Sequence, residues 1–595
     1  TKSYSKRGEA IVKMNHDAIE RGVKEVKKVR VPKEWARAVD NTVQAEAKGG
    51  RPEIKGYIDN VLTHVNAQQG DKLPVSTFVE DADGTVPLGS AAYEKRGIAV
   101  DVPTWIPENC IQCNFCSYVC PHAVIRPAVM TEEEAKNAPD GMKMKPATGL
   151  AGYQFGITIS VLDCTGCGSC ASVCPGMKGN KALVMNPLDT QREEEEKFLY
   201  GYSLPVKPEV AAKFKTSTVK GSQFRQPLLE FSGACAGCGE TPYAKLITQL
   251  FGDRMYIANA TGCSSIWGGS APSTPYCTNK AGKGPAWGNS LFEDNAEFGY
   301  GIFLGQKAIR EKLIGKLDAL KEVSTTASLN DAIDAFMATK DDTKANTACT
   351  EALVAELEKA AKAGCEKSAE ILSEKDYLAK KAVYIFGGDG WSYDIGYGGL
   401  DHVLASGEDV NIVVFDTEVY SNTGGQSSKS TPTGAVAQFA AAGKTVKKKD
   451  LAGIAMSYGY IYVAQVAMGA DYAQTVKAIA EAEAYHGPSL VICYAPCINH
   501  GIRGGMSIAQ TEIKRAVEAG YWNNFRYDPR LAAEGKNPFQ LDSKAPTADY
   551  EAFIKNEVRY SSLERSFPDR AKVLFEKAKE NAASKYEALA KRAEK

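Results

Sequence analysis

The sequence predicts two kinds of domain: an α/β domain with a parallel sheet flanked by helices, and a smaller cysteine-rich α+β domain. From about residue 209 to 550, short apolar runs rich in β-branched residues alternate with helical patterns. This alternation is typical of β-α units that build a parallel sheet. Residues 51–208 hold the densest cysteines, many Gly and Pro breaks and few long periodic runs. A chain of 595 residues is long enough for several such domains.

The predicted domain organisation has four parts and one insertion. Each boundary lies where the composition changes or a Gly/Pro-rich turn occurs. The parts are a helical remainder of a preceding domain (1–50), the cysteine-rich domain (51–208), the α/β domain (209–550) with a helical insertion (310–380), and a charged helical arm (551–595).

Composition excludes several classes of protein. The net charge of −1 argues against a nucleic-acid binder, and the short basic run Lys447–Lys449 favours a solvated loop. No apolar stretch is long enough to span a membrane and no signal peptide is visible, so we expect a cytoplasmic protein. The chain begins at Thr1 without an initiator Met, and we therefore expect the start of the polypeptide to be missing.

Two copies of one cysteine motif give the strongest signal. ENCIQCNFCSYVCPH and LDCTGCGSCASVCPG each space four cysteines by two, two and three residues before a proline. This is the bacterial ferredoxin pattern, in which the fourth cysteine serves the other cluster. The predicted ligands of one [4Fe–4S] cluster are Cys110, Cys113, Cys116 and Cys174; those of the other are Cys164, Cys167, Cys170 and Cys120.

Zinc is the alternative occupant of these motifs. Structural zinc sites usually take two C-x-x-C pairs rather than three thiols in a row followed by C-P, so the spacing favours iron–sulfur clusters. Two such clusters carry electrons and do little else. Another part of the chain must therefore supply or consume those electrons.

A second motif predicts a diphosphate and metal site. In FGGDGWSYDIG, glycines follow a buried strand directly, and Asp389 offers a carboxylate oxygen suited to Mg²⁺. About thirty residues later a second strand ends in FDTEVYSNTGGQ, where Thr417 offers a hydroxyl and Val419 a backbone carbonyl. This is the layout of thiamine diphosphate enzymes, although those more often have Asn at the position of Thr417. Asn422 lies just past this loop. Its side chain either hydrogen-bonds the diphosphate or the substrate, or serves only as a turn residue.

A third cluster site is predicted from the ends of four strands: MYIANATGC (255–263), AVYIFGGDG (382–390), VNIVVFDTEVY (410–420) and SLVICYAPC (489–497). The carboxyl ends of parallel strands meet at one edge of a sheet. Cys263 and Cys497 should therefore meet there, and the C-x-x-C of GACAGCGETPY adds Cys235 and Cys238. Cys277 is the alternative fourth ligand, and a zinc ion stays a possible occupant.

Three further cysteines receive no role from the sequence. Cys493 lies within an apolar strand and is expected to be a small buried residue. Cys349 and Cys365 lie in the helical insertion, where a structural role is the default.

Taken together, the motifs resemble the carboxyl-terminal half of a pyruvate:ferredoxin (flavodoxin) oxidoreductase. The resemblance covers nearly the whole chain and adds YEKRGIAVDVPTW, ATGCSSIWG, FGGDGWSYDIGYGGLDHV and APCINHGI to the motifs above. It implies that Cys235, Cys238, Cys263 and Cys497 hold the cluster nearest to thiamine diphosphate. It also implies coenzyme contacts from Glu240 and Cys263, Mg²⁺ binding by Asp389, Thr417 and the Val419 carbonyl, and a catalytic role for Asn422. The segments implied to line the diphosphate and metal are Gly388, Asp389, Gly390 and Trp391, and Thr417, Glu418, Val419, Tyr420, Ser421 and Asn422.

The resemblance further implies an activity. Pyruvate and coenzyme A are converted reversibly to acetyl-CoA and CO₂, as in anaerobic metabolism, and electrons pass from thiamine diphosphate through three [4Fe–4S] clusters to ferredoxin or flavodoxin. The family is usually homodimeric. Its amino-terminal half, which supplies the Glu that activates the coenzyme, is not found in this sequence, so we expect this chain alone to turn over no pyruvate. The alternatives are an oxidoreductase for another 2-oxo acid, and a polyferredoxin electron carrier with a structural zinc.

Overall fold

The computed structural model describes residues 8–37, 54–269, 272–291, 293–324 and 326–594. Contacts divide the chain into two compact units, Thr1–Lys48 and Gly49–Lys595. In the first unit, α1 (Glu9–Lys24) has no buried residue, and a 3₁₀ turn spans Lys33–Arg37. Residues 1–7 and 38–50 of the predicted segment 1–50 lie outside the described residues. The other predicted domain boundaries stay predictions.

An eight-stranded sheet forms the centre of the second unit, in the order β13-β12-β10-β11-β9-β8-β6-β7. Every pair from β10 to β7 is parallel, whereas β12 and β13 continue one edge in antiparallel fashion. The four predicted strands are confirmed as neighbours, β11, β9, β8 and β6. The strands are β6 (Met255–Ala260), β7 (Ala286–Ser290), β8 (Ala382–Gly388), β9 (Asn411–Asp416), β10 (Tyr462–Val466), β11 (Ser489–Tyr494), β12 (Phe525–Tyr527) and β13 (Phe539–Leu541).

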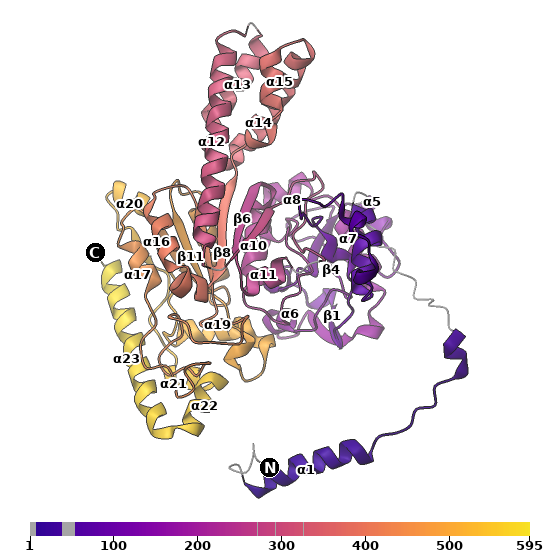
Figure 1. Ribbon diagram of the computed structural model, residues 1–595, viewed down its shortest axis with the longest axis vertical. Coiled ribbons are helices and arrows are strands. Elements are labelled where there is room, and N and C mark those ends of the chain that lie inside the picture. The colour runs from indigo at the N-terminus through magenta and orange to yellow at the C-terminus, as the bar shows by residue number, and fades with distance from the viewer. Residues whose placement is uncertain (1–7, 38–53, 270–271, 292, 325, 595) are drawn as a thin grey trace. The chain divides into compact units, whose positions relative to one another are not determined.

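Helices cover both faces of this sheet (Figure 1), which explains why its central strands are buried at nearly every position and mostly apolar. Alternate residues of one strand belong to different cores: Ile385 of β8 lies in one, and Tyr384 and Phe386 lie in the other. The first face packs against α16 (Tyr397–Ala405), α17 (Leu451–Met456), α19 (Ala509–Glu518), α21 (Tyr550–Lys555), α22 (Val558–Ser566) and α23 (Pro568–Ala593); the second packs against α10 (Thr241–Phe251) and α18 (Tyr472–Glu483).

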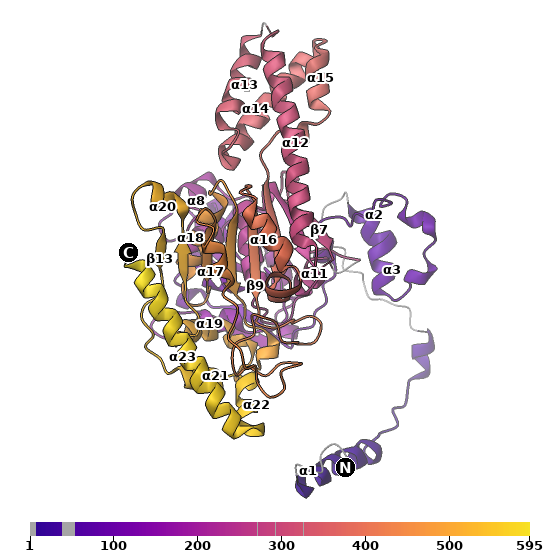
Figure 2. The same ribbon diagram turned by 60° about the vertical axis from the view of Figure 1, so that its left-hand side comes forward.

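The helical insertion projects from the sheet in both views (Figures 1 and 2). Its first helix, α12, starts at Asn295 and packs its first turns on the sheet before leaving it. The distal part has a core of its own, centred on Leu317, Phe336 and Leu357. Its helices are α12 (Asn295–Lys321), α13 (Ala327–Thr339), α14 (Thr343–Lys362) and α15 (Glu366–Leu372).

The cysteine-rich segment contains two small antiparallel sheets, as an α+β domain requires. One pairs β1 (Asp101–Trp105) with β5 (Leu183–Pro187); the other has the order β2 (Ile125–Met130), β4 (Gln154–Ile159), β3 (Lys145–Pro146). The short helices α4 (Phe115–Val119) and α6 (Ser169–Val173) follow the cysteine loops. Further helices are α2 (Lys55–Tyr57), α3 (Thr63–Asn66), α5 (Glu132–Lys136), α7 (Glu194–Ser203), α8 (Pro208–Lys213), α9 (Val219–Ser222), α11 (Cys263–Gly268) and α20 (Pro529–Ala533).

A buried lysine joins this segment to the sheet domain. Lys245 on α10 donates hydrogen bonds to the backbone carbonyls of Ser117, Tyr118 (2.9 Å) and Cys120 (3.2 Å). These carbonyls stand at the C-terminal end of α4, where a cation is favourable. Among the described helices, none is long and apolar enough to cross a membrane.

Candidate active site

Three oxygen atoms meet where β8 and β9 end. The hydroxyl of Thr417 lies 3.0 Å from Oδ1 of Asp389 and 3.1 Å from the carbonyl oxygen of Val419. Asp389 is fully buried. Carboxylate, hydroxyl and carbonyl oxygens are hard ligands of the kind that Mg²⁺ prefers, so the donor set fits the predicted metal.

Asp389 is held in place by a residue that the sequence did not indicate. Ser428 donates a 2.5 Å hydrogen bond to Oδ2 of Asp389, and the backbone N–H of Thr417 donates to Oδ1 at 3.2 Å. Burial, and then the neighbouring Asp416, raise the pKa of Asp389 to about 8. A cation at this point would favour the ionised carboxylate instead.

The three glycines around Asp389 differ in whether the protein itself leaves room for a side chain. A Cβ at Gly387 would clash with the ring of Trp391, and one at Gly390 would clash with Tyr420. At Gly388 the nearest atom to such a Cβ would be the carbonyl oxygen of Phe415 at 3.8 Å. Close packing within the protein therefore explains two of the three, and the predicted approach to a phosphate rests on Gly388.

Glu418 points its side chain away from this loop into a buried charged network. Its backbone is left-handed, with φ of 62°. Its carboxylate pairs with Lys448 and Arg559, both at 2.9 Å, and accepts a hydrogen bond from Tyr521. Although burial opposes ionisation, Lys448 and Arg559 lower its pKa to about 2. Only the backbone of Glu418 is left to serve the predicted site.

The prediction of a solvated loop at Lys447–Lys449 is wrong for two of the three lysines. Lys448 pairs with Asp416 at 2.7 Å as well as with Glu418. Lys449 donates to the carbonyl of Tyr393 at 3.1 Å. The reason is long-range: the carboxylates that Lys448 neutralises lie on a different strand end, about thirty residues earlier in the sequence.

The structure brings Cys235, Cys238, Cys263 and Cys497 together. Burial, then Glu240, then neighbouring sulfurs raise the pKa of Cys263, and those sulfurs belong to Cys238 and Cys497. Burial and the charges of Glu240 and Cys235 raise the pKa of Cys497 to about 11. Cys497 is thus in electrostatic reach of all three other thiols.

Cys277, the alternative fourth ligand, is placed elsewhere. Its thiol is fully buried and donates to the carbonyl of Pro227 at 3.6 Å. Cys493 is buried within β11, Cys349 lies in α14, and Cys365 precedes α15 and accepts a hydrogen bond from Ser368 at 3.3 Å.

Glu240 lies among the third set of cysteines. Its carboxylate is buried and accepts a 2.7 Å hydrogen bond from the indole N–H of Trp267. Burial raises its pKa to about 7. Its charge raises the pKa of Cys238, Cys263 and Cys497. The ionisation of Glu240 is therefore coupled to the charge of these sulfurs.

The loop that begins at Thr417 reaches the third cysteine set. Oγ of Ser421 lies 3.1 Å from Sγ of Cys263. The side-chain amide of Asn499 donates to the carbonyl of Ser421 at 3.3 Å and to Sγ of Cys497 at 3.6 Å. Asn422, the predicted catalytic residue, is exposed at the end of this loop. The predicted metal site and the third cysteine set are therefore parts of one site.

The fourth cysteine of each ferredoxin motif lies within electrostatic reach of at least two of the other motif's first three cysteines; the assignment of ligands to clusters stays a prediction. Burial and the charges of Cys110 and Cys174 raise the pKa of Cys113, and the same two sulfurs act on Cys116. In the second set, Cys120 acts on Cys164, whose pKa burial raises to about 12, and on Cys167 and Cys170.

The second and third sets are joined by their backbones. The backbone N–H of Gly237, between Cys235 and Cys238, acts on the Cys167 thiol and opposes the rise that burial causes in its pKa. The ring of His122 donates from Nε2 to the carbonyl of Ala234 at 2.9 Å. Neither contact was indicated by the sequence, since each joins loops more than sixty residues apart.

In the described part of the chain, no three His, Cys, Asp or Glu side chains are arranged to hold one metal ion.

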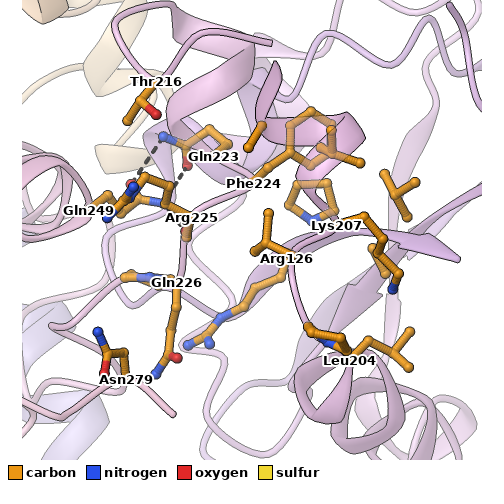
Figure 3. Close-up of a pocket in the computed structure, with 18 of the residues that line it drawn as sticks. Arg126, Leu204, Lys207, Thr216, Gln223, Phe224, Arg225, Gln226, Gln249 and Asn279 are labelled. Atoms are coloured by element: carbon orange, nitrogen blue, oxygen red, sulfur yellow. Dashed lines mark hydrogen bonds between the residues drawn. The ribbon is translucent and has the colours of Figure 1, made fainter. Parts of the chain in front are cut away.

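A cavity of about 500 Å³ lies apart from all these residues, between the cysteine-rich segment and α10 (Figure 3). Its wall includes Arg126, Phe224 and the amides of Gln223 and Gln249, which bond each other at 3.0 and 3.4 Å. No predicted site residue lines it.

Comparison with known families identifies three regions. Residues 364–493 match the thiamine pyrophosphate enzyme, C-terminal TPP-binding domain, and residues 109–180 match the 4Fe-4S dicluster domain. Residues 41–99 match the EKR domain of unknown function. These matches confirm the predicted fold class and the presence of a thiamine diphosphate-binding domain and a [4Fe–4S] domain.

Curated relatives match along almost the whole chain. A pyruvate-flavodoxin oxidoreductase of Klebsiella pneumoniae is 54% identical over 98% of this chain and 49% of its own length. A pyruvate:ferredoxin oxidoreductase of Moorella thermoacetica is 54% identical over 100% of this chain and 50% of its own. The mitochondrial pyruvate dehydrogenase [NADP(+)] of Euglena gracilis is 44% identical over 98% of this chain and 32% of its own.

The chain thus spans about half the length of the first relatives that it matches. Among solved structures, a 2-oxoglutarate:ferredoxin oxidoreductase of Magnetococcus marinus has 15% identity over 55% of this chain and 86% of its own, with a TM-score of 0.27, a likeness that carries no argument. With its coenzyme-binding and dicluster domains in one chain, this sequence is a relative of the pyruvate-flavodoxin and pyruvate:ferredoxin oxidoreductases along nearly all of its residues.

Proposed function

We propose that the chain is part of a pyruvate:ferredoxin (flavodoxin) oxidoreductase, which converts pyruvate and coenzyme A reversibly to acetyl-CoA and CO₂. The observation that carries this proposal is the 3.1 Å contact between Ser421 and Cys263. It places the loop of the predicted diphosphate and metal site against the third cysteine set. A decarboxylation site and an electron acceptor then lie side by side, as oxidation of a 2-oxo acid requires.

The chain's own residues have distinct tasks in this proposal. Asp389, Thr417 and the Val419 carbonyl would hold Mg²⁺, and thiamine diphosphate, when bound, supplies the electron sink for decarboxylation. Glu240 presents a buried carboxyl group with a pKa of about 7, able to hold or release a proton. Asn422, exposed at the loop end, offers an amide to the reacting substrate.

The three cysteine sets would hold three [4Fe–4S] clusters that supply one-electron transfer. Two observations support an order of the clusters: the backbone of Gly237, in the third set, acts on Cys167 of the second, and Cys116 of the first set acts on Cys170 of the second. We infer that electrons leave to ferredoxin or flavodoxin in this order. A cytoplasmic homodimer, as in the family resembled, completes the proposal.

Anaerobic reconstitution of the 595-residue chain with iron and sulfide tests it. We expect about twelve irons per chain and no zinc, since each cluster holds four irons. Reduction of ferredoxin or flavodoxin by pyruvate and coenzyme A should require the half of the relatives' length that this chain does not span. Steady turnover by this chain alone would contradict that requirement.

Two outcomes would favour the alternatives. About eight irons and one zinc per chain would favour a polyferredoxin with a structural zinc. Faster turnover of another 2-oxo acid than of pyruvate by the completed enzyme would favour a different substrate.

A further inference from the structure

A second cavity, of about 750 Å³, lies between α23 and the face of the sheet at β10. Its volume is in the range of small-molecule sites. One wall is the C-terminal helix, and another is formed by the loop 447–452. Glu418 and Lys448 both line the cavity. Glu418 directly follows Thr417, whose hydroxyl contacts Asp389 in the predicted metal loop.

Helix α23 makes room for a ligand along one side. Ala578, Ala582 and Ala588 line the cavity, together with Asn581 and Lys585. Residues three or four apart share one face of a helix. A face that covers a sheet usually fills its space with large apolar side chains. Among the α23 residues that line this cavity, Leu589 is the one large apolar side chain; the others are three alanines and four polar residues, Asn581, Ser584, Lys585 and Arg592.

Two buried hydrogen-bond donors on the cavity wall have no partner. The indole N–H of Trp522 and the side-chain amide nitrogen of Asn581 are both without a hydrogen-bond partner in the described part of the chain. Trp522 is only 3% exposed. Buried donors are normally satisfied, so both await an acceptor.

The charge of the cavity points to an anion. Five cationic side chains line it against two carboxylates; the cations are Lys447, Lys448, Lys449, Lys585 and Arg592, and the carboxylates are Glu418 and Asp450. Glu418 and Lys448 neutralise each other within a network that also holds Arg559 and Asp416. Lys585 lies 3.9 Å from Asp450, at the outer limit of an ion pair. The cationic surplus of the wall therefore comes from Lys447, Lys449 and Arg592. The remaining wall is apolar or aromatic, with Met456, Leu589 and Tyr550.

We propose that this cavity binds a small organic anion, a phosphate or carboxylate carried on a flat apolar body. The ligand's oxygens would accept hydrogen bonds from Trp522 and Asn581 and neutralise Lys585, while its body contacts the apolar wall. The indole of Trp522, the amide nitrogen of Asn581 and the ammonium of Lys585 are all hydrogen-bond donors, so a ligand without an acceptor atom would leave all three unpaired. Apart from Glu418, the residues that line this cavity lie outside the predicted diphosphate loop.

Calorimetric titration of the complete 595-residue chain tests the proposal, with phenyl phosphate, benzoate, benzyl alcohol and inorganic phosphate as probes. At least one aromatic anion should bind saturably with one site per chain, at least about tenfold more tightly than benzyl alcohol or inorganic phosphate. Whether phenyl phosphate or benzoate binds better identifies the anionic group.

Three variants locate the binding. Trp522→Phe removes the N–H but keeps a ring, and Lys585→Met removes the charge but keeps the length; each should weaken binding about tenfold. Lys579→Met is the matched control, since Lys579 is exposed on the same helix and does not line the cavity. Equal thermal midpoints show that each variant is folded; where Trp522→Phe is not, Lys585→Met alone decides.

The proposal is overturned if neither aromatic anion binds better than benzyl alcohol and inorganic phosphate, or if Lys585→Met and Lys579→Met bind equally well. It is also overturned if thiamine diphosphate with Mg²⁺ displaces the probe competitively, because the probe would then occupy the diphosphate loop.

Discussion

Thr417 joins the two strand ends of the predicted metal site through one hydroxyl. It contacts both Asp389 and the Val419 carbonyl. Thr417→Val keeps the shape and removes the oxygen, so Mg²⁺-dependent binding of thiamine diphosphate should weaken about tenfold or more. Thr417→Asn restores an oxygen ligand and should bind within a few-fold of the unchanged protein. Calorimetry at several Mg²⁺ concentrations measures both, and equal binding by the Val and Asn variants would remove Thr417 from the metal site.

Ser421 is placed to tune the third cluster. With an ionised Cys263, the hydroxyl donates to the sulfur across 3.1 Å, and such hydrogen bonds set the potentials of iron–sulfur clusters. Ser421→Ala removes roughly 1 kcal/mol of this stabilisation of the reduced form, equivalent to about 40 mV for one electron. The potential of one cluster should fall by that amount. A redox titration followed by electron paramagnetic resonance checks it, with the other two clusters as internal references; a uniform shift of all three would argue against a local effect.

The loop from Cys235 to Cys238 depends on a glycine for its path. Gly237 has a φ of 78°, and a Cβ there would lie 2.6 Å from Cβ of Met506. Gly237→Ala should therefore displace the loop and lose the irons of the third cluster, leaving about eight of about twelve. Gly282→Ala is the control, because Gly282 also has a positive φ (72°) but open space around it. Iron analysis after reconstitution distinguishes the two, and an unchanged iron content in Gly237→Ala would contradict the prediction.

The elements that sequence predicts well are those with a strong local pattern. The four central strands are apolar runs of six or seven residues. Strand ends in a parallel sheet must meet, so the places of Cys263 and Cys497 after two such strands are enough to predict that they lie together. β7 contains Gly288 and Asn289, and β12 and β13 have three residues each; none carries such a pattern.

Contacts between distant loops lie beyond local patterns. The contacts of Ser428 with Asp389, of Lys448 with Asp416 and of the His122 ring with the Ala234 carbonyl depend on how elements pack. A serine or lysine in a loop has many ordinary roles, and its sequence neighbours do not distinguish them. Sequence thus predicts the cysteine and oxygen ligands of the site, but not the residues that orient them.

At the scale of the whole molecule, the projecting insertion is structurally separate from the candidate active site. The distal helices have their own core, and their two ends are close, since Lys312 and Glu374 form a 2.6 Å ion pair. Replacing residues 317–372 by a short Gly/Ser linker, with Leu313 and Leu378 changed to Ser, should leave iron content and coenzyme binding unchanged. Iron analysis and calorimetry measure this; a loss of either would show that the insertion supports the site from a distance.

Lys245 limits how the cysteine-rich segment can be separated from the sheet domain. Its ammonium group lies on a helix of the sheet domain, yet it serves three carbonyls of the cysteine-rich segment. A fragment that ended before α10 would expose those carbonyls and lose their shared cation. The segment has a ferredoxin-like pattern, but it depends on a residue of the neighbouring domain. A gene fusion or a domain exchange at this junction would therefore have to include Lys245 together with the cluster-binding segment.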